Sequence, residues 1–270
     1  MAASVAILIL MALVKIKNGG EMSLLTITSY NIHKGMSPLN RLVKMTQMGQ
    51  ALSGVAPDVL CLQEVQGQNL KRVISYNEYP EQSQHEWFGE YLKLKSDYGR
   101  NADYAHGHHG NAVLSRYPLD PKHNVNITVN RLEQRGVLHC EITVAEHPPI
   151  VVLNAHLNLL NRDRVKQYDA ICEYICCEID DDKPLILAGD FNDWGRQAKK
   201  HLAKLGLSEA FEVMYGTSPA TFPAKLPILS LDRIFVKNLT VKNAIVHAGV
   251  PWSNLSDHLP ISACLLYTSP

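Results

Sequence analysis

An acid and an amide follow an apolar run in the second half of the chain, as Asp190 and Asn192. The run, residues 184–188, is short and continuously apolar, which is typical of a strand buried on both faces. Residues two apart on extended backbone point the same way, so the two side chains would project together from one edge of the core. Such a pair can hold a metal, a phosphate or a water, although an Asx-rich turn that closes a strand has the same pattern.

A similar arrangement occurs earlier in the chain. Asn31 and His33 end one strand-like run and Glu64 ends the next, while the later half offers Asn154 and His156 and then the acid at position 190. The two Asn-x-His pairs lie 123 residues apart and the two acids 126 apart, so the spacing is nearly conserved. A two-layered fold built from two similar halves would bring five polar residues to the same end of two packed sheets. These are Asn31, Glu64, His156, Asp190 and Asn192.

Two further segments place an acid where an apolar strand begins. Asp232 precedes the run 234–236, and Asp257 with His258 precedes another apolar segment. An Asp that hydrogen-bonds the imidazole would make His258 a base or a transition-state donor, and Asp232 is the natural candidate.

A glycine- and histidine-rich stretch, residues 106–116, is predicted to be a loop that enters a strand. Its histidines lack a matching acid or cysteine nearby, which favours solvated or phosphate-facing side chains over metal ligands. Asn111, at the mouth of the strand, is the better candidate for contacting substrate. Arg135 opens the next strand and is either a surface charge or a planar donor for a phosphoryl group.

The length of 270 residues and an apolar content of 46% suit one large domain, because no linker or low-complexity segment separates the halves. The 26 basic and 26 acidic residues balance, which argues against a strongly cationic nucleic-acid groove as the dominant feature. Four helices are predicted, at residues 39–53, 83–94, 163–179 and about 196–205. Cys172, Cys176 and Cys177 lack a second zinc-ligand pair and are predicted to be buried helix-face thiols, as suits a reducing cytoplasm.

Both ends of the chain are interpreted separately from the domain, which we place at residues 22–264. Residues 1–21 contain an apolar run too short to span a membrane and without a cleavage site, so we expect a non-native or disordered extension and no stable membrane insertion. Residues 265–270 resemble a translated adaptor sequence more than a native strand, which makes this tail of doubtful origin. The expected location is the cytoplasm.

Taken together, the motifs resemble those of the endonuclease/exonuclease/phosphatase superfamily, whose fold is that of pancreatic deoxyribonuclease. The resemblance extends over almost the whole chain, and Leu231-Asp232-Arg233-Ile234 supports it. The loops around residues 98–101 and 106–116 look most like those of a small bacterial group within it. Five separated motifs occur in the family's order: Tyr30-Asn31-Ile32-His33, Leu62-Gln63-Glu64-Val65, Asn154-Ala155-His156-Leu157, Gly189-Asp190-Phe191-Asn192 and Ser256-Asp257-His258.

The resemblance implies a metal site on one side of the scissile phosphate. Glu64 would be the main magnesium ligand, with Asn31 and Asp257 close to the metal. Hard oxygen ligands fit Mg²⁺ or Mn²⁺ better than zinc.

The resemblance also implies the other catalytic roles. Asp190 and Asn192 would position the attacking water, with Asp190 helping to deprotonate it, and His258 would face the phosphate, oriented by Asp232. Whether Asp190 or His258 is the general base stays open. His156 and Arg135 would donate to the phosphate oxygens.

The expected fold is therefore a four-layer α/β sandwich, with two packed mixed β-sheets and helices on the outer faces. The expected function is metal-dependent hydrolysis of a phosphodiester or phosphomonoester by an activated water, in a monomer. A DNA or RNA nuclease of the same superfamily is one alternative, and a phosphate-binding module without catalysis is another. The charge balance favours a small-molecule or lipid-derived substrate over duplex nucleic acid.

Overall fold

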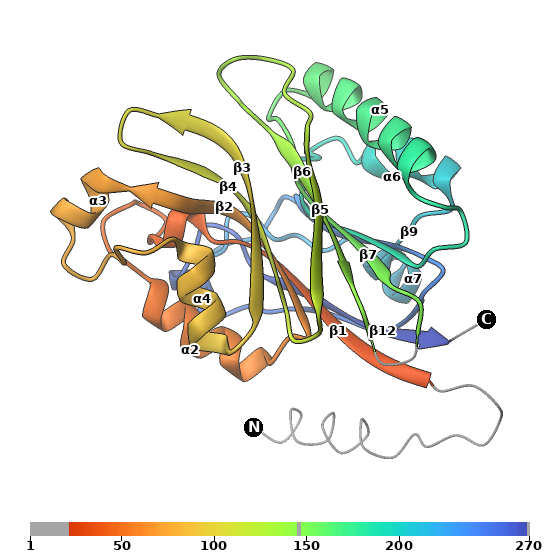
Figure 1. Cartoon of the computed structure of the whole chain (residues 1–270), viewed down its shortest axis with the longest axis horizontal. Coiled ribbons are helices and arrows are strands. Elements are labelled where there is room, and N and C mark those ends of the chain that lie inside the picture. Colours follow the sequence, from red (N-terminus) through yellow and green to blue (C-terminus); the bar gives the residue numbers. More distant parts are fainter. Residues whose placement is uncertain (1–21, 145–146, 269–270) are drawn as a thin grey trace.

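Two six-stranded mixed sheets form the centre of the protein in the computed structural model, which describes residues 22–144 and 147–268 (Figure 1). The predicted extension at residues 1–21 lies outside the described residues. The first sheet contains, in spatial order, β11 (Thr240–Val246), β12 (Ile261–Thr268), β1 (Met22–Asn31), β2 (Val59–Asn69), β4 (Gly107–Ser115) and β3 (Lys95–Tyr104). The second contains β5 (Leu119–Asn126), β6 (Gly136–Ile142), β7 (Ile150–His156), β8 (Leu185–Asp190), β10 (Asp232–Lys237) and β9 (Ser208–Glu209).

Each of the two sheets contains one pair of parallel neighbouring strands. β1 pairs with β2 in parallel, and β7 pairs with β8 in parallel, while the other named pairs are antiparallel. The carboxyl ends of parallel neighbours lie at the same edge of a sheet. Each parallel pair therefore delivers the polar residues that follow its two strands to one place, as the repeat in the sequence predicted.

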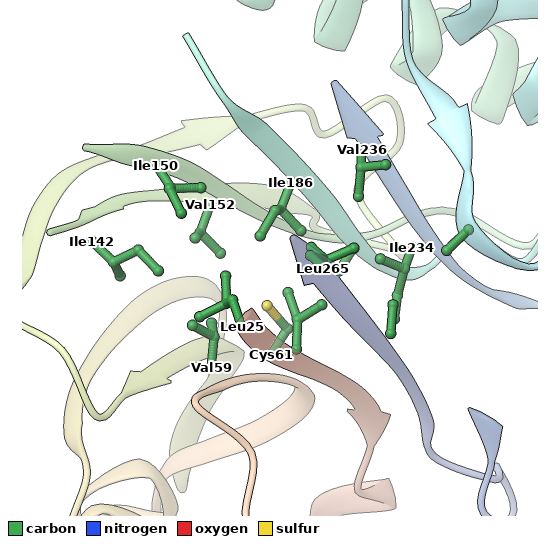
Figure 2. Close-up of a cluster of buried hydrophobic side chains, with 14 of the residues drawn as sticks. Leu25, Val59, Cys61, Ile142, Ile150, Val152, Ile186, Ile234, Val236 and Leu265 are labelled. Carbon is green, nitrogen blue, oxygen red and sulfur yellow. The ribbon is translucent and has the colours of Figure 1, made fainter. Parts of the chain in front are cut away.

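The alternation of side chains along β8 explains why the sandwich has four layers. Ile186 and Ala188 face the first sheet and join the core between the sheets, which also includes Leu25, Val59 and Leu265 (Figure 2). Leu185 and Leu187 point to the opposite face and pack with residues of a helix. Every residue of β8 is buried, so the continuous apolar run has the two-sided burial that its pattern predicted.

Helices cover both outer faces (Figure 1). On the first sheet, Met45, Met48 and Leu52 of one helix pack against the outer side chains of β1 and β2. On the second, Tyr168 and Ile171 of another pack over β7 and β8. The helices are α2 (Met45–Val55), α3 (Leu70–Ser75), α4 (Gln84–Leu92), α5 (Asn161–Glu178), α6 (Ala198–Leu202) and α7 (Ala210–Tyr215). The predicted four-layer α/β sandwich is confirmed.

The four predicted helices are present as α2, α4, α5 and α6, with shifted ends. α2 begins six residues later than predicted because residues 37–42 turn around Ser37, whose hydroxyl accepts from the backbone N–H of Arg41 and Leu42. The burial predicted for the helix cysteines is wrong for two of the three. Cys172 is buried, but Cys176 and Cys177 are exposed because α5 packs through one face only.

Two segments differ from the sequence prediction. The glycine- and histidine-rich stretch is a strand, β4, which extends the β3–β4 hairpin instead of forming a loop. β12 continues to Thr268, beyond the boundary placed at residue 264, and Leu265 and Tyr267 are buried in the core between the sheets. The interpretation of the tail as non-strand is therefore wrong for residues 265–268, since alternate apolar side chains there fit the pairing with β1. No helix in the described ranges combines the length and apolar character needed to span a bilayer.

Candidate active site

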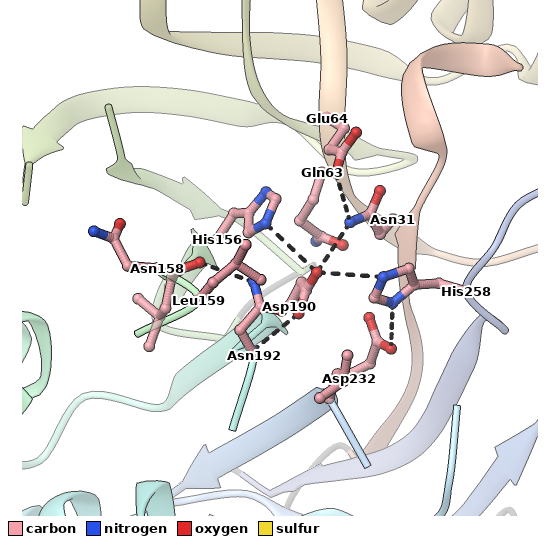
Figure 3. A network of polar contacts seen from close by, with 12 residues as sticks. Asn31, Gln63, Glu64, His156, Asn158, Leu159, Asp190, Asn192, Asp232 and His258 are labelled. Atoms are coloured by element: carbon pink, nitrogen blue, oxygen red, sulfur yellow. Dashed lines mark hydrogen bonds and ion pairs between the residues drawn. The ribbon is translucent and has the colours of Figure 1, made fainter. Parts of the chain in front are cut away.

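The polar strand ends predicted from the sequence meet at one edge of the two sheets (Figure 3). Strand register brings them there: Asn31 lies opposite Gln63, His156 opposite Asp190, and Asp190 opposite Asp232. His258 lies just before β12, whose first residue pairs with Ser29 near the end of β1. Strands from both sheets thus contribute to a single site.

A hydrogen-bonded dyad forms on one side of the site. His258 Nδ1 lies 2.9 Å from Asp232 Oδ2, and His258 Nε2 lies 3.6 Å from Asp190 Oδ2. All three side chains are buried. Burial by itself would lower the pKa of His258, but the carboxylates of Asp232 and Asp190 outweigh it and raise that pKa above the ordinary value. His258 therefore carries its proton at neutral pH, and the predicted pairing of His258 with Asp232 is present in the structure.

Asp190 is the most densely contacted group of the site. Its Oδ2 accepts from Asn31 Nδ2 at 3.0 Å and lies 3.5 Å from His156 Nε2, while its Oδ1 accepts from the backbone N–H of Asn192 at 3.0 Å. Burial raises the pKa of the Asp190 carboxyl, and the charge of His258 offsets part of that rise. A buried carboxylate with a raised pKa is a stronger proton acceptor than an exposed one.

His156 and Asn192 flank that carboxylate. Burial, followed by the nearby Arg135, lowers the pKa of His156 well below its ordinary value, so its imidazole is neutral. Asn192 has a left-handed backbone with φ 47°, and its Nδ2 donates to Leu157 O at 3.0 Å. This bond ties the loop after β8 to the loop after β7 and fixes both side chains beside Asp190.

Glu64 lies on the other side of Asn31 and is partly exposed. A register shift in the β2–β4 pairing between Leu62 and Val65 places it in a left-handed conformation with φ 57°. Its Oε2 lies 3.0 Å from Lys34 Nζ, and its Oε1 accepts from Asn31 Nδ2 at 3.4 Å. Burial would raise the pKa of Glu64, but Lys34 and the neighbouring histidines more than offset it, so this pKa is lowered.

Asp257 completes the acidic side of the site. Its Oδ2 lies 3.2 Å from His33 Nδ1, which is also 4.0 Å from Glu64 Oε2. Burial by itself would raise the pKa of Asp257, but the hydrogen bond from His33 and the charge of His258 together outweigh it, so this pKa is lowered overall. Two carboxylates, Glu64 and Asp257, are therefore close neighbours of the imidazole of His33, and Glu64 is also paired with the ammonium of Lys34.

Two places in the site could accept a cation. Asp190, Asp232 and His258 have ligand atoms within 4.8 Å of one another, but they are buried and already bonded to each other. Glu64 and Asp257 are more open, and Lys34 and His33 lie beside them. Hard carboxylate oxygens with access to water are what Mg²⁺ and Mn²⁺ require, so the second place fits such an ion better.

The prediction that Asn111 contacts substrate is corrected by its position. Its side chain is buried, and Nδ2 donates to the carbonyls of Gly136 and Asn154 at 3.0 and 3.2 Å. Asn111 belongs to the first sheet and both acceptors to the second. It therefore ties the two sheets together behind the site, because a buried amide must satisfy its donors within the protein.

Arg135 lies beside the site, as the resemblance implied. Its Nη2 is 3.4 Å from Glu133 Oε1, and its charge contributes to the lowered pKa of both His156 and His109. Its Nε is buried without a hydrogen-bond partner in the part of the chain that the structure describes. A guanidinium with an unused donor at this position is available to an anion.

Sequence reasoning missed Lys34 and His109. Lys34 directly follows the Asn-x-His motif, so a basic residue adjacent to a metal-type acid was a usable signal. For His109 the sequence predicts a solvated or phosphate-facing side chain without an acidic partner, but burial, followed by Arg135, lowers its pKa to about 4, and Glu64 is among its charged neighbours. That proximity depends on the β2–β4 pairing, which the loop prediction excluded.

Residues 28–258 match the model of the Endonuclease/Exonuclease/phosphatase family, and the chain belongs to that family. Members of the family are in general hydrolases of phosphoester bonds that depend on divalent metals. The membership predicted from the motifs is thereby confirmed.

Relatives and solved structures agree with this assignment. The uncharacterized protein YbhP of Escherichia coli K12 is 38% identical over 244 residues, which are 88% of this chain and 94% of YbhP. An endonuclease/exonuclease/phosphatase from Beutenbergia cavernae has a TM-score of 0.71 at 19% identity, covering 90% of this chain and 71% of that one. D. rerio TDP2 complexed with a single-strand DNA product has a TM-score of 0.64 at 18% identity, covering 90% and 99%. These structures share the fold.

Proposed function

We propose that the protein is a divalent-metal-dependent phosphodiesterase that activates a water for attack on phosphorus. One observation carries the proposal. A single buried carboxylate, Asp190, contacts the amide of Asn31 and the imidazoles of His156 and His258. Asp232 holds the second imidazole, and the Asn31 amide also donates to the more open Glu64. A lone structural acid would not need so many converging donors.

The metal would be held by Glu64, Asp257 and the side chain of Asn31. We propose Mg²⁺ or Mn²⁺, because these donors are hard oxygens and two of them are carboxylates. Bound there, the ion would stabilise negative charge on the phosphoryl oxygens.

The protein side chains would supply the remaining functions. Asp190, with its raised pKa, accepts a proton from the water that Asn192 helps to orient. Protonated His258, held by Asp232, donates to the phosphate, and neutral His156 donates to another oxygen. Arg135 adds a charged donor. If His258 instead gave up its proton first it could serve as the base, which the elevated pKa of the imidazolium disfavours.

We propose a small or lipid-derived phosphodiester as the substrate. A nuclease is the second candidate, favoured by the fold it shares with a protein solved with a single-strand DNA product. The net charge of 0 supports the first, because tight binding to duplex DNA requires many cationic contacts. A phosphate-binding module without catalysis is the third reading, and the complete set of converging donors speaks against it.

The test is hydrolysis of bis-p-nitrophenyl phosphate with Mg²⁺, with Mn²⁺ and with chelator. We expect turnover with either metal and none with chelator. A panel of DNA, RNA, phospholipids and sugar or inositol phosphates then ranks the substrate classes. Absence of turnover with every metal and substrate would favour the binding module, and efficient nicking of duplex DNA at physiological salt that outpaces every small diester would favour the nuclease.

A further inference from the structure

Exposed apolar side chains are concentrated at the end of the sandwich that holds the site. Loops at this end follow β1, β7 and β8 or precede β6, β10 and β12, as the strand registers require. Nine of the sixteen large hydrophobic side chains exposed in the described ranges lie on these loops. They are Leu39, Leu42, Leu132, Leu159, Leu160, Trp194, Leu226, Ile228 and Val250. Scattered exposure is ordinary, but concentration around a site marks an interaction surface.

Four of these residues form a group that we call the leucine rim: Leu132, Leu159, Leu160 and Trp194. The loops that carry them are joined, because the backbone N–H of Leu159 donates to Glu133 Oε1 at 3.2 Å. Leu159, Leu160 and Trp194 also line one open hollow of about 360 Å³. Leu132 is 96% exposed, which is more than any other large apolar residue described.

The rim lies directly beside the proposed reaction centre. Leu159 is three residues beyond His156 and two beyond Leu157, whose carbonyl accepts the hydrogen bond from Asn192 (Figure 3). Trp194 is two residues beyond Asn192, and Leu132 lies on the same loop as Arg135. A substrate group bonded to the phosphate would therefore meet the rim.

The charges of the rim loops are unbalanced in favour of arginine, although the whole chain is neutral. Arg131 and Arg196 are exposed on these loops. Arg162 is exposed in the first turn of α5, where its Nε lies 3.5 Å from Asp163 Oδ1. The acids of the same three segments, residues 127–135, 157–164 and 191–197, are turned inward. Asp163 accepts from Asn130 and Asn158, Asp193 from the backbone N–H of residues 197 and 198, and Glu133 from Leu159. The face offered to a partner is apolar with a positive border.

We infer that the leucine rim docks the protein on an anionic lipid surface and that the substrate is a lipid phosphodiester presented there. The identification of the substrate rests on the proposed function. Protruding leucines flanked by arginines match the requirements of a bilayer interface, where apolar groups enter and cations meet anionic head groups. Single-stranded nucleic acid fits less well, because bases stack on aromatic rings and the rim has only one, Trp194.

Vesicle binding tests this inference without any turnover. The full chain is sedimented, in chelator, with vesicles of phosphatidylcholine alone or with an equal share of phosphatidylglycerol. We expect binding to the anionic vesicles that weakens with salt. Leu132→Ser should weaken partitioning about tenfold, since a buried leucine contributes roughly that factor. Arg131→Gln and Arg196→Gln should each weaken it about fivefold, on anionic vesicles only.

Val213→Ser is the matched control, because Val213 is also exposed but lies on α7, away from the rim. It should bind like the wild type, and circular dichroism should show all variants folded. Equal binding by Leu132→Ser and the wild type, or no binding to anionic vesicles, would overturn the inference. Binding of a single-stranded oligonucleotide instead, lost in Leu132→Ser, would assign the rim to nucleic acid. Failure to hydrolyse any diester would overturn the proposed function, and vesicle binding in chelator is independent of that result.

Discussion

The parallel pairs β1–β2 and β7–β8 have the same local structure but place their polar residues in different surroundings. Asp190, the last residue of β8, is fully buried and its pKa is raised by that burial. Glu64, on β2, is partly exposed, and Lys34 together with the neighbouring histidines outweighs its burial, so that its pKa is lowered. The first acid is suited to accept a proton and the second to bind a cation. Environment, and not residue type, separates their chemistry.

The two Asn-x-His motifs differ in the same way. Asn31 donates to both acids of the site. Asn154, its counterpart, lies in the core, where Nδ2 donates to the carbonyls of Leu62 and Ala112 and Oδ1 accepts from Gln63 Nε2. The asparagine of the first copy faces the site, and the asparagine of the second copy holds the two sheets together, although His156 of that copy also reaches the site. Equivalent positions of a repeat can therefore hold a working residue and a structural one.

The largest expected effect separates the two acids. Asp190→Asn should lower turnover about a thousandfold or more at any metal concentration, because it removes a proton acceptor. Glu64→Gln should lower turnover by a similar factor at low Mg²⁺, because the substitution removes a charged ligand. The turnover of this variant should recover in part at high Mg²⁺. Turnover of bis-p-nitrophenyl phosphate across a magnesium titration measures both. Identical magnesium dependence in the two variants would contradict the division of roles, and near-wild-type activity of Glu64→Gln at low magnesium would remove Glu64 from the metal site.

The next effect concerns the dyad of His258 and Asp232, which is buried beside Asp190, whereas the pair of His33 and Asp257 beside Glu64 is more open. Asp232→Asn should lower turnover about a hundredfold, because His258 loses its orientation. Without the carboxylate the pKa of His258 falls, so the loss of activity as pH rises should begin at a lower pH than in the wild type. The pH profile measures that shift. The double variant with His258→Ala should cost little more than His258→Ala alone, and fully additive losses would show that the two residues act independently.

Asn154→Leu tests the structural copy of the motif. It removes the side-chain donor to two buried carbonyls and the shortest of the three hydrogen bonds made by Gln63 Nε2, so the free energy of unfolding should fall by about 3 kcal/mol. Asn31→Ala should cost less stability and more activity. Urea denaturation together with turnover compares them. A pair of variants with the opposite order of effects would mean that the roles of the two asparagines are reversed.

The smallest effect concerns Lys34, which directly follows the first Asn-x-His motif. The residue that follows the second motif is Leu157, which carries no charge. Lys34→Met removes a cation that competes for the carboxylate, so the divalent metal should bind about fivefold more tightly. Calorimetry with Mn²⁺ measures this without any turnover. Lys71→Met, on the exposed face of α3, is the control and should leave metal affinity unchanged. Weaker metal binding by Lys34→Met would show that Lys34 supports the site instead of compensating for an absent ion.

The sequence by itself determined the strands, their pairing into two similar halves and the set of residues at their ends. Apolar runs such as residues 184–188 can be stable only as buried strands, and the positions of Asp190 and Glu64 follow from where such runs end. The family and its four-layer fold could be predicted from the sequence for the same reason. The metal, the substrate and the monomeric state stay predictions.

Only the tertiary structure decided which of those residues have a structural role and which face the site. Three features depend on neighbours that are distant in the sequence. They are the hydrogen bonds by which Asn111 links the sheets, the burial of Asn154 and the contact of Lys34 with Glu64. The leucine rim likewise forms from three loops that are separate in sequence. Local patterns fix which residues reach a strand end. The packing of one sheet on the other sets their exposure and charge, and those set the chemistry.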